Sequence, residues 1–570
     1  MKFSVGKQAM SLLGTIQQSS GALQAAQIGL QVVGNNIANS NTPGYIRQQL
    51  EQSSAAVRVG GLIKGQGVRP TGIVQVVDKA LAERMFHAKT SLSGSESLQK
   101  AYSQLEEITT DLNNTGLSQQ FTLFNNSLHE LSAQPGDGSL REFVVLQGET
   151  LASNIQRTRE DVLARRELWN GELEGIASQI NRLTERIAQL NLEIASIEGG
   201  GLVRSDATGL RDQRYRDLES LAEFVDINMQ EQQNGTVSVF VGGDYLISNG
   251  TNREVYSAYN PNSEGNEIRV VETDSPLQVK EGIVASTMTA RDRVFGDFVD
   301  SIDSMAASLI RSVNEVHSQG QGRQGFDHLV TSVTADAGVP LVNAGLPWDP
   351  RNGSFDMNLV DDQGQLISSH RINVRRLGQV DDSTVGSIVE DINAIAGVRA
   401  SVTSEGKIEI FSESPSARFT FGEDTSGFLA AAGVNTFFSG RNGFDIRVNE
   451  RLVQDSDYLA ISRGGIGEDT DVLAELIDLV DQPLDHLDGR SVRETYEDFV
   501  SGLGQKIALQ DNATEGLRNF YGTLQSQHLA ITGVNIDEES IRMIAYQRAF
   551  QASSRVIATA SEMLELLVSL

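Results

Sequence analysis

The side chains best able to do chemistry in this sequence are seven scattered histidines. Cysteine is absent, which removes thiolate nucleophiles, thiolate metal sites and disulfides. The histidines stand at positions 87, 129, 317, 328, 370, 486 and 528. His317 and His328 flank a glycine-rich stretch, and this is the one spacing that suggests a metal site. Roles at the surface or in capping are favoured over metal binding for both.

Paired carboxylates are the other candidates for chemistry, and they fall where turns are expected. The aspartate pairs at 361–362 and 381–382 lie in predicted turns and are interpreted as solvated. The stretch 349–356 resembles an acidic loop, but its Asn352-Gly353 pair favours a hairpin turn. The acidic run 468–488 is typical of a solvated helix face. We therefore expect no catalytic residue, no metal and no cofactor, and the chain is predicted not to be an enzyme.

Composition narrows the range of partners. The chain has 570 residues, and 46 basic against 75 acidic side chains give it a net charge of −29. Such a balance argues against nucleic acid as a partner. No apolar run is long enough to span a membrane, and Leu12–Ile16 is too short for a secretory signal. Residues 464–467 are glycine-rich but lack the strand–helix context of a nucleotide-binding loop.

The N-terminal segment predicts a helix with apolar packing and no charged face. From Gln8 to Ile46 there is no Lys, Arg, His, Asp or Glu, so this is not a solvated surface helix. Its apolar residues follow the four-three spacing of a coiled coil. This N-terminal packing seam comprises Leu12, Ile16, Ser19, Leu23, Ala26, Leu30, Val33 and Ile37.

A corner ends this helix. Asparagines compete for backbone hydrogen bonds, the residue before a proline is pushed out of the helical region, and glycine accepts a positive φ. These features predict that the chain turns within residues 35–45. The corner motif comprises Asn35, Asn36, Asn39, Asn41, Thr42, Pro43, Gly44 and Tyr45.

The C-terminal segment mirrors the first. Its packing seam again steps four-three and comprises Ala549, Ser553, Val556, Ala560, Met563, Leu567 and Leu570. One interpretation is that both terminal helices belong to the core of a single bundle. The other is that they pair and then pack against copies of themselves. The lack of charge on every face favours the second interpretation, because a helix face exposed to solvent normally carries charged residues.

The middle of the chain predicts a long helix and several β segments. A helix of about 140–198, closed by Gly199-Gly200-Gly201, carries an unbroken seam. The seam comprises Leu173, Ile176, Ile180, Leu183, Ile187, Leu190, Ile194 and Ile197. Residues 225–283 predict short strands with turns at Asn234-Gly235 and Asn249-Gly250. A helix is expected at 284–318 and again from about 469.

The predicted fold is a multidomain α+β protein. A terminal coiled-coil pair is formed by residues 1–44 and 534–570. A bundle of long helices, drawn from both ends of the chain, comprises 45–326 and 463–533, with β-hairpin elements at 45–77 and 225–283. Residues 327–462 form an inserted β-rich domain, in which a helix at 384–395 is capped by Ser383.

Five stretches resemble the bacterial flagellar axial proteins, which are the rod, hook and hook-associated proteins. Residues 20–45 resemble the N-terminal motif shared by all of them. Residues 533–567, 210–224 and 314–327 resemble segments of the hook-associated members, although Tyr215 replaces a usual acid and the last stretch has extra residues. Residues 383–412 look like a small insertion module of those proteins.

The resemblance implies a structural subunit that joins the hook to the flagellin filament as a self-assembling ring. It implies export in unfolded form by the flagellar type III system, hence a cytoplasmic stage and then an extracellular flagellar location. The implied partners are further copies of the chain, hook protein, a second junction protein or flagellin-side subunits, and an export chaperone on the C-terminal helix. No membrane partner is expected.

Three alternatives stay open at this point. A hook or distal-rod subunit is the nearest, although the long helix at 140–198 and the sequence 533–539 argue against it. A secreted hydrolase would need two carboxyls converging in a cleft, and the sequence offers acids only in turns. An adhesin-like function of the insert alone is the third.

Overall fold

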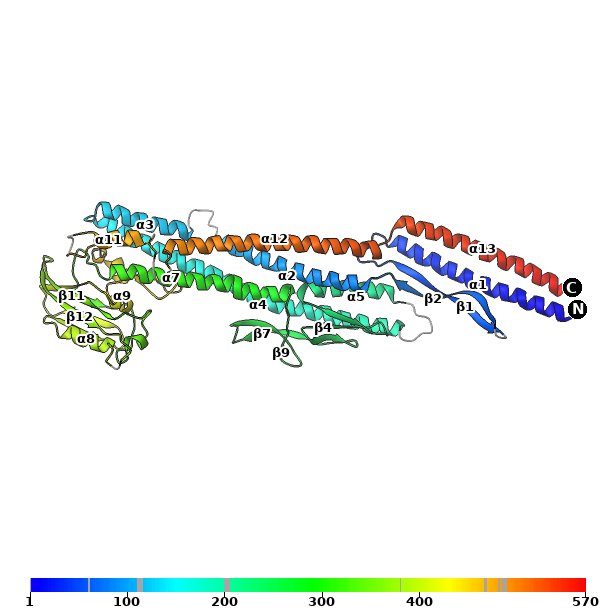
Figure 1. The fold of residues 1–570 in the computed structure, drawn as a ribbon, viewed down its shortest axis with the longest axis horizontal. Helices are drawn as coiled ribbons and strands as arrows, with labels where there is room; N and C mark the ends of the chain where they lie inside the picture. Colours follow the sequence, from blue (N-terminus) through cyan, green and yellow to red (C-terminus); the bar gives the residue numbers. More distant parts are fainter. Residues whose placement is uncertain are drawn as a thin grey trace. The chain divides into compact units, whose positions relative to one another are not determined.

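The structure is a computed structural model that divides into two compact units. It describes residues 2–59, 62–109, 116–198, 206–379, 381–465, 469–479, 482–483 and 489–569. Unit 1 comprises residues 1–100, 168–290 and 509–570, and unit 2 comprises 101–167 and 291–508 (Figure 1). The helices α2 (Lys79–Thr109), α4 (Gly138–Glu198) and α12 (Val492–Thr532) contribute residues to both. The domain boundaries expected from the sequence run differently and stay a prediction.

Unit 1 contains the paired ends of the chain. Helix α1 (Lys2–Ala38) and helix α13 (Ile536–Ser569) run side by side (Figure 1). Two glycines of α1 allow close approach. A Cβ at Gly29 would lie 2.5 Å from Cε1 of Tyr546 on α13, and one at Gly21 would lie 2.7 Å from the Val68 carbonyl oxygen. Small residues in the uncharged part of this helix therefore set how closely its neighbours pack.

A long hairpin follows the corner and lies along α1. Strand β1 (Gln48–Val59) pairs antiparallel with β2 (Leu62–Gln75), in a register that joins Gln48 to Gln75. The register shifts between Glu51 and Gln52 and again between Ser54 and Ala56. Both strands contact α1. The hairpin expected at 45–77 is confirmed.

The long-helix seam forms much of the core of unit 1. It packs with helix α5 (Thr208–Phe224) and with the small sheets. Seven of the eight predicted residues are buried, while Ile197 is 57% exposed. Ile197 is the last residue but one of α4, and Glu198 beyond it is the residue that binds Arg211 of α5. The glycines at 199–201 lie outside the described residues.

Two antiparallel sheets complete unit 1. Strands β3 (Asn228–Glu231), β4 (Val237–Val241), β5 (Asp244–Ser248) and β6 (Thr251–Asn252) form the first. Strands β7 (Val255–Asn260), β8 (Gly265–Val270) and β9 (Ser275–Pro276) form the second. The two predicted Asn-Gly turns lie at their expected places between β3 and β4 and between β5 and β6. Gly235 and Gly250 both have positive φ there.

The helix expected at 284–318 is present with an irregular centre. Helix α6 (Gly282–Thr289) passes through a π-helical turn, Ala290–Phe295, into α7 (Gly296–His317). In unit 2, α7 is accompanied by α3 (Leu117–Ala133) and by the first half of α4. Helix returns at α11 (Asp471–Leu479) and α12.

The insert contains two three-stranded sheets. In the first, β11 (Gly353–Asp361) lies between β12 (Leu366–Val374) and β15 (Ala417–Gly422). In the second, β14 (Ile408–Ser412) lies between β10 (His328–Val330) and β13 (Val398–Val402). The insert also contains the short elements η2 (Leu341–Asn343), α9 (Phe428–Ala432), β16 (Phe438–Ser439), β17 (Arg447–Val448), α10 (Glu450–Gln454) and η3 (Ser456–Tyr458).

Two local predictions in the insert are wrong. Helix α8 (Val385–Asn393) is capped by Thr384, which forms a capping box with Ser387. The Ser383 hydroxyl instead accepts a hydrogen bond from the Arg375 N–H. Asn352-Gly353 is not a hairpin turn, because Gly353 begins β11 and the Asn352 side chain accepts from the Arg376 N–H.

The end of the insert is joined closely to the helices of unit 2. The Asn314 side chain on α7 donates to the Phe438 carbonyl and accepts from the N–H groups of Phe437 and Phe438. The Phe124 ring of α3 lies 5.5 Å from that of Phe437. The end of the insert is therefore packed against α3 and α7.

Candidate functional site

The histidines considered as possible metal ligands, His317 and His328, make structural contacts instead. His317 is fully buried, where its Nδ1 meets the Asn435 carbonyl and its Nε2 accepts from the Ala460 N–H. Burial lowers the pKa of His317 to about 4, so the imidazole is neutral. His328 pairs instead with Glu409 across β10 and β14. Over the residues that the structure describes, no three His, Asp or Glu side chains gather as metal ligands.

The aspartates of the predicted turns accept hydrogen bonds from nearby backbone N–H groups. Asp361 accepts from the N–H groups of Gln363 and Gln365, and Asp382 accepts from those of Leu377 and Gly378. The acidic run at 468–488 lies partly outside the described residues. Within the described ranges, no helix combines the length and apolar character needed to cross a bilayer.

Asn36 of the corner motif lies at the centre of a buried polar cluster, which we call the joint. Its amide nitrogen donates to the Gln48 carbonyl and to Oε2 of Glu539, both at 2.9 Å. Its amide oxygen accepts from the Tyr45 hydroxyl at 2.8 Å and from the Gln48 N–H at 3.0 Å. The side chain is fully buried and all four of its hydrogen-bonding positions are used. One asparagine therefore links α1, the corner, β1 and α13.

A buried glutamate and an arginine extend the joint. The Glu539 side chain has no exposed surface, and Arg47 lies 2.8 Å from its Oε1. Arg47 also contacts Glu538 at 3.1 Å, and its backbone N–H donates to the Thr532 carbonyl. Burial, with the nearby carboxylates of Asp212 and Glu539, raises the pKa of Tyr45. A buried carboxylate needs such partners, since an unpaired charge would be costly in this position.

Asp212 connects the same region to α5. Its Oδ1 accepts from the Ile46 N–H at 3.3 Å and from the Gln75 side chain at 2.5 Å. Gln48 reaches the same helix through the Thr208 hydroxyl at 2.9 Å. Asp212 is 6% exposed, and this burial raises its pKa to about 7, despite lowering contributions from the Ile46 N–H, Arg216 and Gln75.

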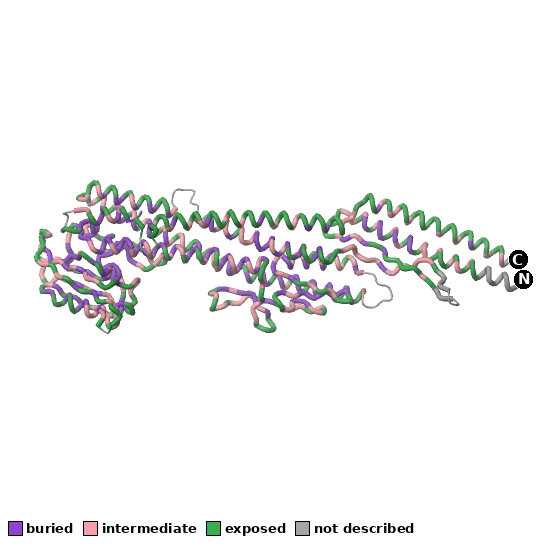
Figure 2. The backbone as a smooth tube through the Cα atoms, in the orientation of Figure 1, coloured by how far each residue is buried: buried purple, intermediate pink, exposed green. Residues whose placement is uncertain are grey.

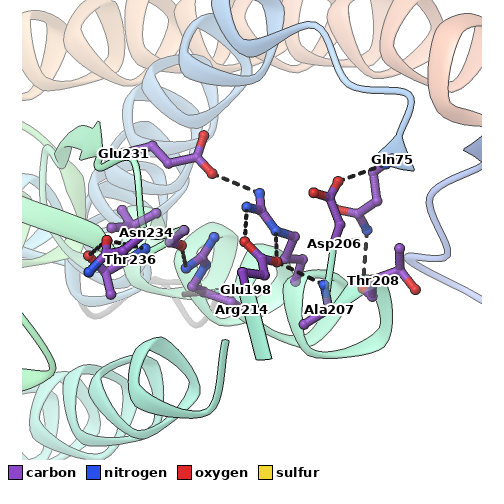
Figure 3. A network of polar contacts seen from close by, with 12 residues as sticks. Gln75, Glu198, Asp206, Ala207, Thr208, Arg214, Glu231, Asn234 and Thr236 are labelled. Carbon is purple, nitrogen blue, oxygen red and sulfur yellow. Dashed lines mark hydrogen bonds and ion pairs between the residues drawn. The ribbon is translucent and has the colours of Figure 1, made fainter. Parts of the chain in front are cut away.

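The polar contacts continue from Gln75, the last residue of β2, to Asp206 and Thr208 at the start of α5 (Figure 3). Arg211 binds Glu198 and Glu231, each at 2.7 Å. Although burial alone would raise it, hydrogen bonds from Arg211 and from the Ala207 N–H hold the pKa of Glu198 below its usual value. Arg214 donates to the Asn191 side chain and to the Gly235 carbonyl, and burial lowers its pKa to about 10. This network fixes α5 to the end of α4, and α5 carries Asp212.

The predicted corner motif divides into a buried and an exposed half. Asn36 and Tyr45 enter the joint, while Asn41, Thr42, Pro43 and Gly44 are exposed. Asn35 and Asn39 bond to one another, and the Thr42 hydroxyl donates to Asn39. Gly44 has a φ of 73°, as its place in the turn predicted. The arrangement provides positioning and no reactive group.

The N-terminal seam is partly covered within the chain. Ala26 and Val33 are buried, and the other seam residues are half-buried: Leu12, Ile16, Ser19, Leu23, Leu30 and Ile37. Beside them Met10 is 77% exposed. Pairing with α13 and the hairpin therefore leaves much of this helix open to solvent.

The C-terminal seam is covered less. Ala560 is buried, Ser553 and Leu567 are half-buried, and Ala549, Val556 and Met563 are exposed. Leu570 lies outside the described residues. The half-buried residues of α13 are Ser540, Arg542, Met543, Tyr546, Ser553, Ile557, Leu564 and Leu567. The covered stripe keeps Ser553, Ala560 and Leu567 of the predicted seam, but Ile557 and Leu564 replace Val556 and Met563. Figure 2 shows α13 exposed along most of its length.

Sequence reasoning missed Arg47, Gln75, Asp212 and Glu539 as members of the joint. One signal was available, because Arg47 is the first charged residue after the long uncharged stretch from Gln8 to Ile46. A lone charge at such a boundary suggests a specific partner. Its partner Glu539 is 492 residues further along the chain, a separation that no local pattern reports.

Three family models match parts of the chain. The model described as flagellar hook-associated protein FlgK helical domain matches residues 102–328. The model described as flagellar basal body rod FlgEFG protein C-terminal matches residues 525–570, and the model described as flagella basal body rod protein matches residues 16–45. The two end matches include residues 16–38 of α1, the joint residue Asn36 and α13.

Individual relatives are similar over most of their length. Flagellar hook-associated protein 1 of Escherichia coli (strain K12) is 23% identical over 581 residues, which span 97% of this chain and 99% of the relative. The protein of the same name from Bacillus subtilis (strain 168) is 27% identical over 347 residues, covering 54% of this chain and 68% of its own. The flagellar hook junction protein FlgK from Burkholderia pseudomallei is 16% identical, with a TM-score of 0.49, and the match covers 79% of this chain and 100% of that one.

The first prediction tests Asn36. The substitution Asn36→Ala removes four hydrogen bonds and leaves the Gln48 backbone, the Tyr45 hydroxyl and Glu539 short of partners in a buried place. Since each unsatisfied buried group costs about 1–3 kcal/mol, we expect a loss of about 3 kcal/mol or more in the free energy of unfolding of unit 1. Urea unfolding measures it. The exposed Asn41→Ala is the matched control, expected within about 0.5 kcal/mol of the parent; equal losses for both variants would rule out a buried hub.

The second prediction concerns pH and Asp212. Its pKa is about 7 in the folded chain against an ordinary value of 3.8, so the folded state binds the proton more tightly than the unfolded state. Its contribution to stability is therefore present at low pH and is lost as the pH rises from about 4 through about 7. Asp212→Asn keeps an oxygen for both hydrogen bonds without the charge.

We expect Asp212→Asn to be more stable than the parent above neutral pH, with a difference that shrinks toward pH about 4. Thermal unfolding of both chains across this range measures the difference, and effects common to both chains cancel. The nearby half-buried Asp206 also accepts from Gln75, so Asp206→Asn controls for loss of a carboxylate. A pH-independent difference for Asp212→Asn contradicts the assignment.

Proposed function

The chain is related over nearly its full length to flagellar hook-associated protein 1, and on this premise we propose that it is a structural subunit joining the flagellar hook to the flagellin filament. The single observation that carries the proposal is the pairing of the two chain ends through the joint at Asn36. Both ends then enter an assembly as one two-helix element. A subunit that packs against its neighbours through both chain ends needs the two ends held together.

The exposed apolar residues of the terminal helices support assembly with further copies. On α13 they are Ile536, Ile541, Ile544, Phe550, Val556, Met563 and Leu566, exposed by 36% to 69%. Only five charged residues follow Ile541 on this helix. Extended apolar surface on a soluble chain marks an interaction site. A closed ring, in which each α13 and α1 meets a neighbour, would bury it on every subunit.

The proposed partners follow from the relation to flagellar hook-associated protein 1. They are copies of the chain in the ring, hook protein on one side, and a second junction protein or flagellin-side subunits on the other. The proposal includes export of the chain through the flagellar type III system, from the cytoplasm to an extracellular position on the flagellum. An α13 this apolar would need a chaperone before export, because its faces are uncovered until assembly.

The alternatives have less support. A hook or distal-rod subunit would share the terminal helices, but the match to a hook-associated helical domain over 102–328 favours the junction role. A hydrolase needs two carboxyls at one cleft, and the insert aspartates 361 and 382 are instead engaged by backbone N–H groups. The prediction that the chain is not an enzyme stays an expectation.

The third prediction tests packing between subunits. Leu23 and Leu30 of the N-terminal seam are half-buried in the single chain, and in a ring they would lie in dry helix–helix contacts. Leu30→Asp or Leu23→Asp would place an unpaired charge there, which costs about several kcal/mol per subunit. We expect a folded chain by circular dichroism that forms no ring or junction in electron micrographs.

A matched control is Leu366→Asp, which places the same charge on a leucine of β12 that is 62% exposed. It should assemble as the parent does. Normal assembly of Leu30→Asp, or equal failure of the control, would refute the packing proposed for the seam.

A further inference from the structure

Helix α13 carries a second four-three seam, on the side that the rest of the chain leaves open (Figure 2). None of its residues is charged and all are exposed, with Val556, Met563 and Leu566 exposed by 43% to 65%. We call it the outer seam, and it comprises Ala545, Ala549, Ala552, Val556, Thr559, Met563 and Leu566. Its spacing is that of the coiled-coil positions that meet a partner helix. Because all seven residues are exposed, no described helix of the same chain is that partner.

The two flanks of the outer seam differ in character. One flank is buried or half-buried beside α1, where the Tyr546 ring lies so close to Gly29 that a Cβ there would be 2.5 Å from it. The residues of this covered flank are Tyr546, Ser553, Ala560 and Leu567. The open flank is exposed and charged, and it comprises Arg548, Arg555 and Glu562 at intervals of seven residues. In a coiled coil, charges in such flanking positions select the partner and its direction.

The charges of the open flank are available to a partner. The ion pairs that α13 makes within the chain involve residues 538, 539 and 542, which lie in its first two turns. Among the described residues, none is made by the three charges of the open flank. After Ile541 the helix carries three arginines against two glutamates, a balance of +1 in a chain of −29. Two copies of so acidic a chain repel one another over most of their surface, and this near-neutral helix is a place where they can meet.

The charge pattern of the open flank specifies an antiparallel partner. In a parallel pair of α13 helices, the open flank of one would face the flank that α1 covers on the other. In an antiparallel pair the two open flanks face each other. Arg555 then lies opposite Glu562 of the second copy, and Glu562 lies opposite Arg555 of the second copy. The same contact is thus made twice, as a two-fold interface requires.

Side-chain size along the outer seam favours the same direction. The seam begins with three alanines and ends with Met563 and Leu566. Reversing one helix places Ala549 opposite Leu566 and Ala552 opposite Met563, so that small and large side chains interdigitate. A parallel pair in register would set alanine against alanine at the first three positions. We propose that α13 pairs antiparallel with α13 of a second copy, and that the chain outside the flagellum is a two-fold symmetric dimer.

This dimer has a consequence for assembly. It covers Val556, Met563 and Leu566, which in the proposed ring meet neighbouring subunits. Since the subunits of a ring all point the same way along its axis, the antiparallel pair must separate before a subunit joins. The dimer would therefore keep this apolar surface from unspecific association until assembly. That consequence rests on the proposed junction role, whereas the pairing itself does not.

Sedimentation equilibrium of the full chain tests the pairing. We expect a dimer whose dissociation constant rises with salt, because its ion pairs are exposed at the edge of the seam. Arg555→Glu and Glu562→Arg each set like charges opposite one another twice, so each should raise the dissociation constant by about tenfold or more. An equimolar mixture of the two variants should regain the dimer, because each facing pair then joins a glutamate to an arginine. Both positions are exposed, so circular dichroism should show unchanged helix content.

The matched control is Glu515→Arg, which makes the same change of charge at an exposed acid of α12 and should dimerise as the parent does. A parent that is monomeric at every concentration, equal weakening by Glu515→Arg, or a mixture that stays as weak as its two components would overturn the proposal. The measurement needs neither hook nor filament. An intact dimer in a chain that forms no junction would therefore contradict the proposed function alone and support the pairing.

Discussion

A single buried asparagine sets the constraint on which the rest of unit 1 depends. Asn36 bonds to Gln48, Tyr45 and Glu539, so the end of α1, the corner, the start of β1 and the first turn of α13 are tied at one point. Glu539 can be buried there because Arg47 and Asn36 both donate to it. Two ends of a 570-residue chain are thus brought together by polar groups, since the apolar contact along α1 and α13 alone is too adaptable to fix their relative register.

The same arrangement explains what the terminal helices leave uncovered. With the joint fixing where α1 and α13 begin to pair, only one stripe of each helix meets the other. Val556 and Met563 stay exposed on α13, as Met10 does on α1. These side chains have no function in the single chain, and they suit contacts with neighbouring subunits in a ring. The proposed junction role therefore separates two tasks, since polar groups set position and apolar groups supply association.

Much of this fold could be predicted from local pattern, and the exceptions have physical causes. The long-helix seam, the 45–77 hairpin and the Asn-Gly turns depend on neighbouring residues and were predicted. The cap of α8 was assigned one residue early because Ser383 and Thr384 are both good caps, and the Arg375 N–H engages the serine. The C-terminal seam admits two stripes that share Ser553, Ala560 and Leu567, and sequence alone does not choose between Val556 and Ile557 or between Met563 and Leu564. The joint escaped prediction because Arg47, Asp212 and Glu539 are close only after folding.

The most direct test of this account is a double-mutant cycle between Asn36 and Glu539. The free energy of unfolding of unit 1 is measured for the parent, Asn36→Ala, Glu539→Ala and the double variant. If the buried contact at 2.9 Å ties the chain ends together, the two substitutions should couple by about 1–3 kcal/mol, because the second one removes a group that the first has already left unpaired. Additive losses, equal within about 0.5 kcal/mol, would contradict the joint as the interaction that holds both ends of the chain.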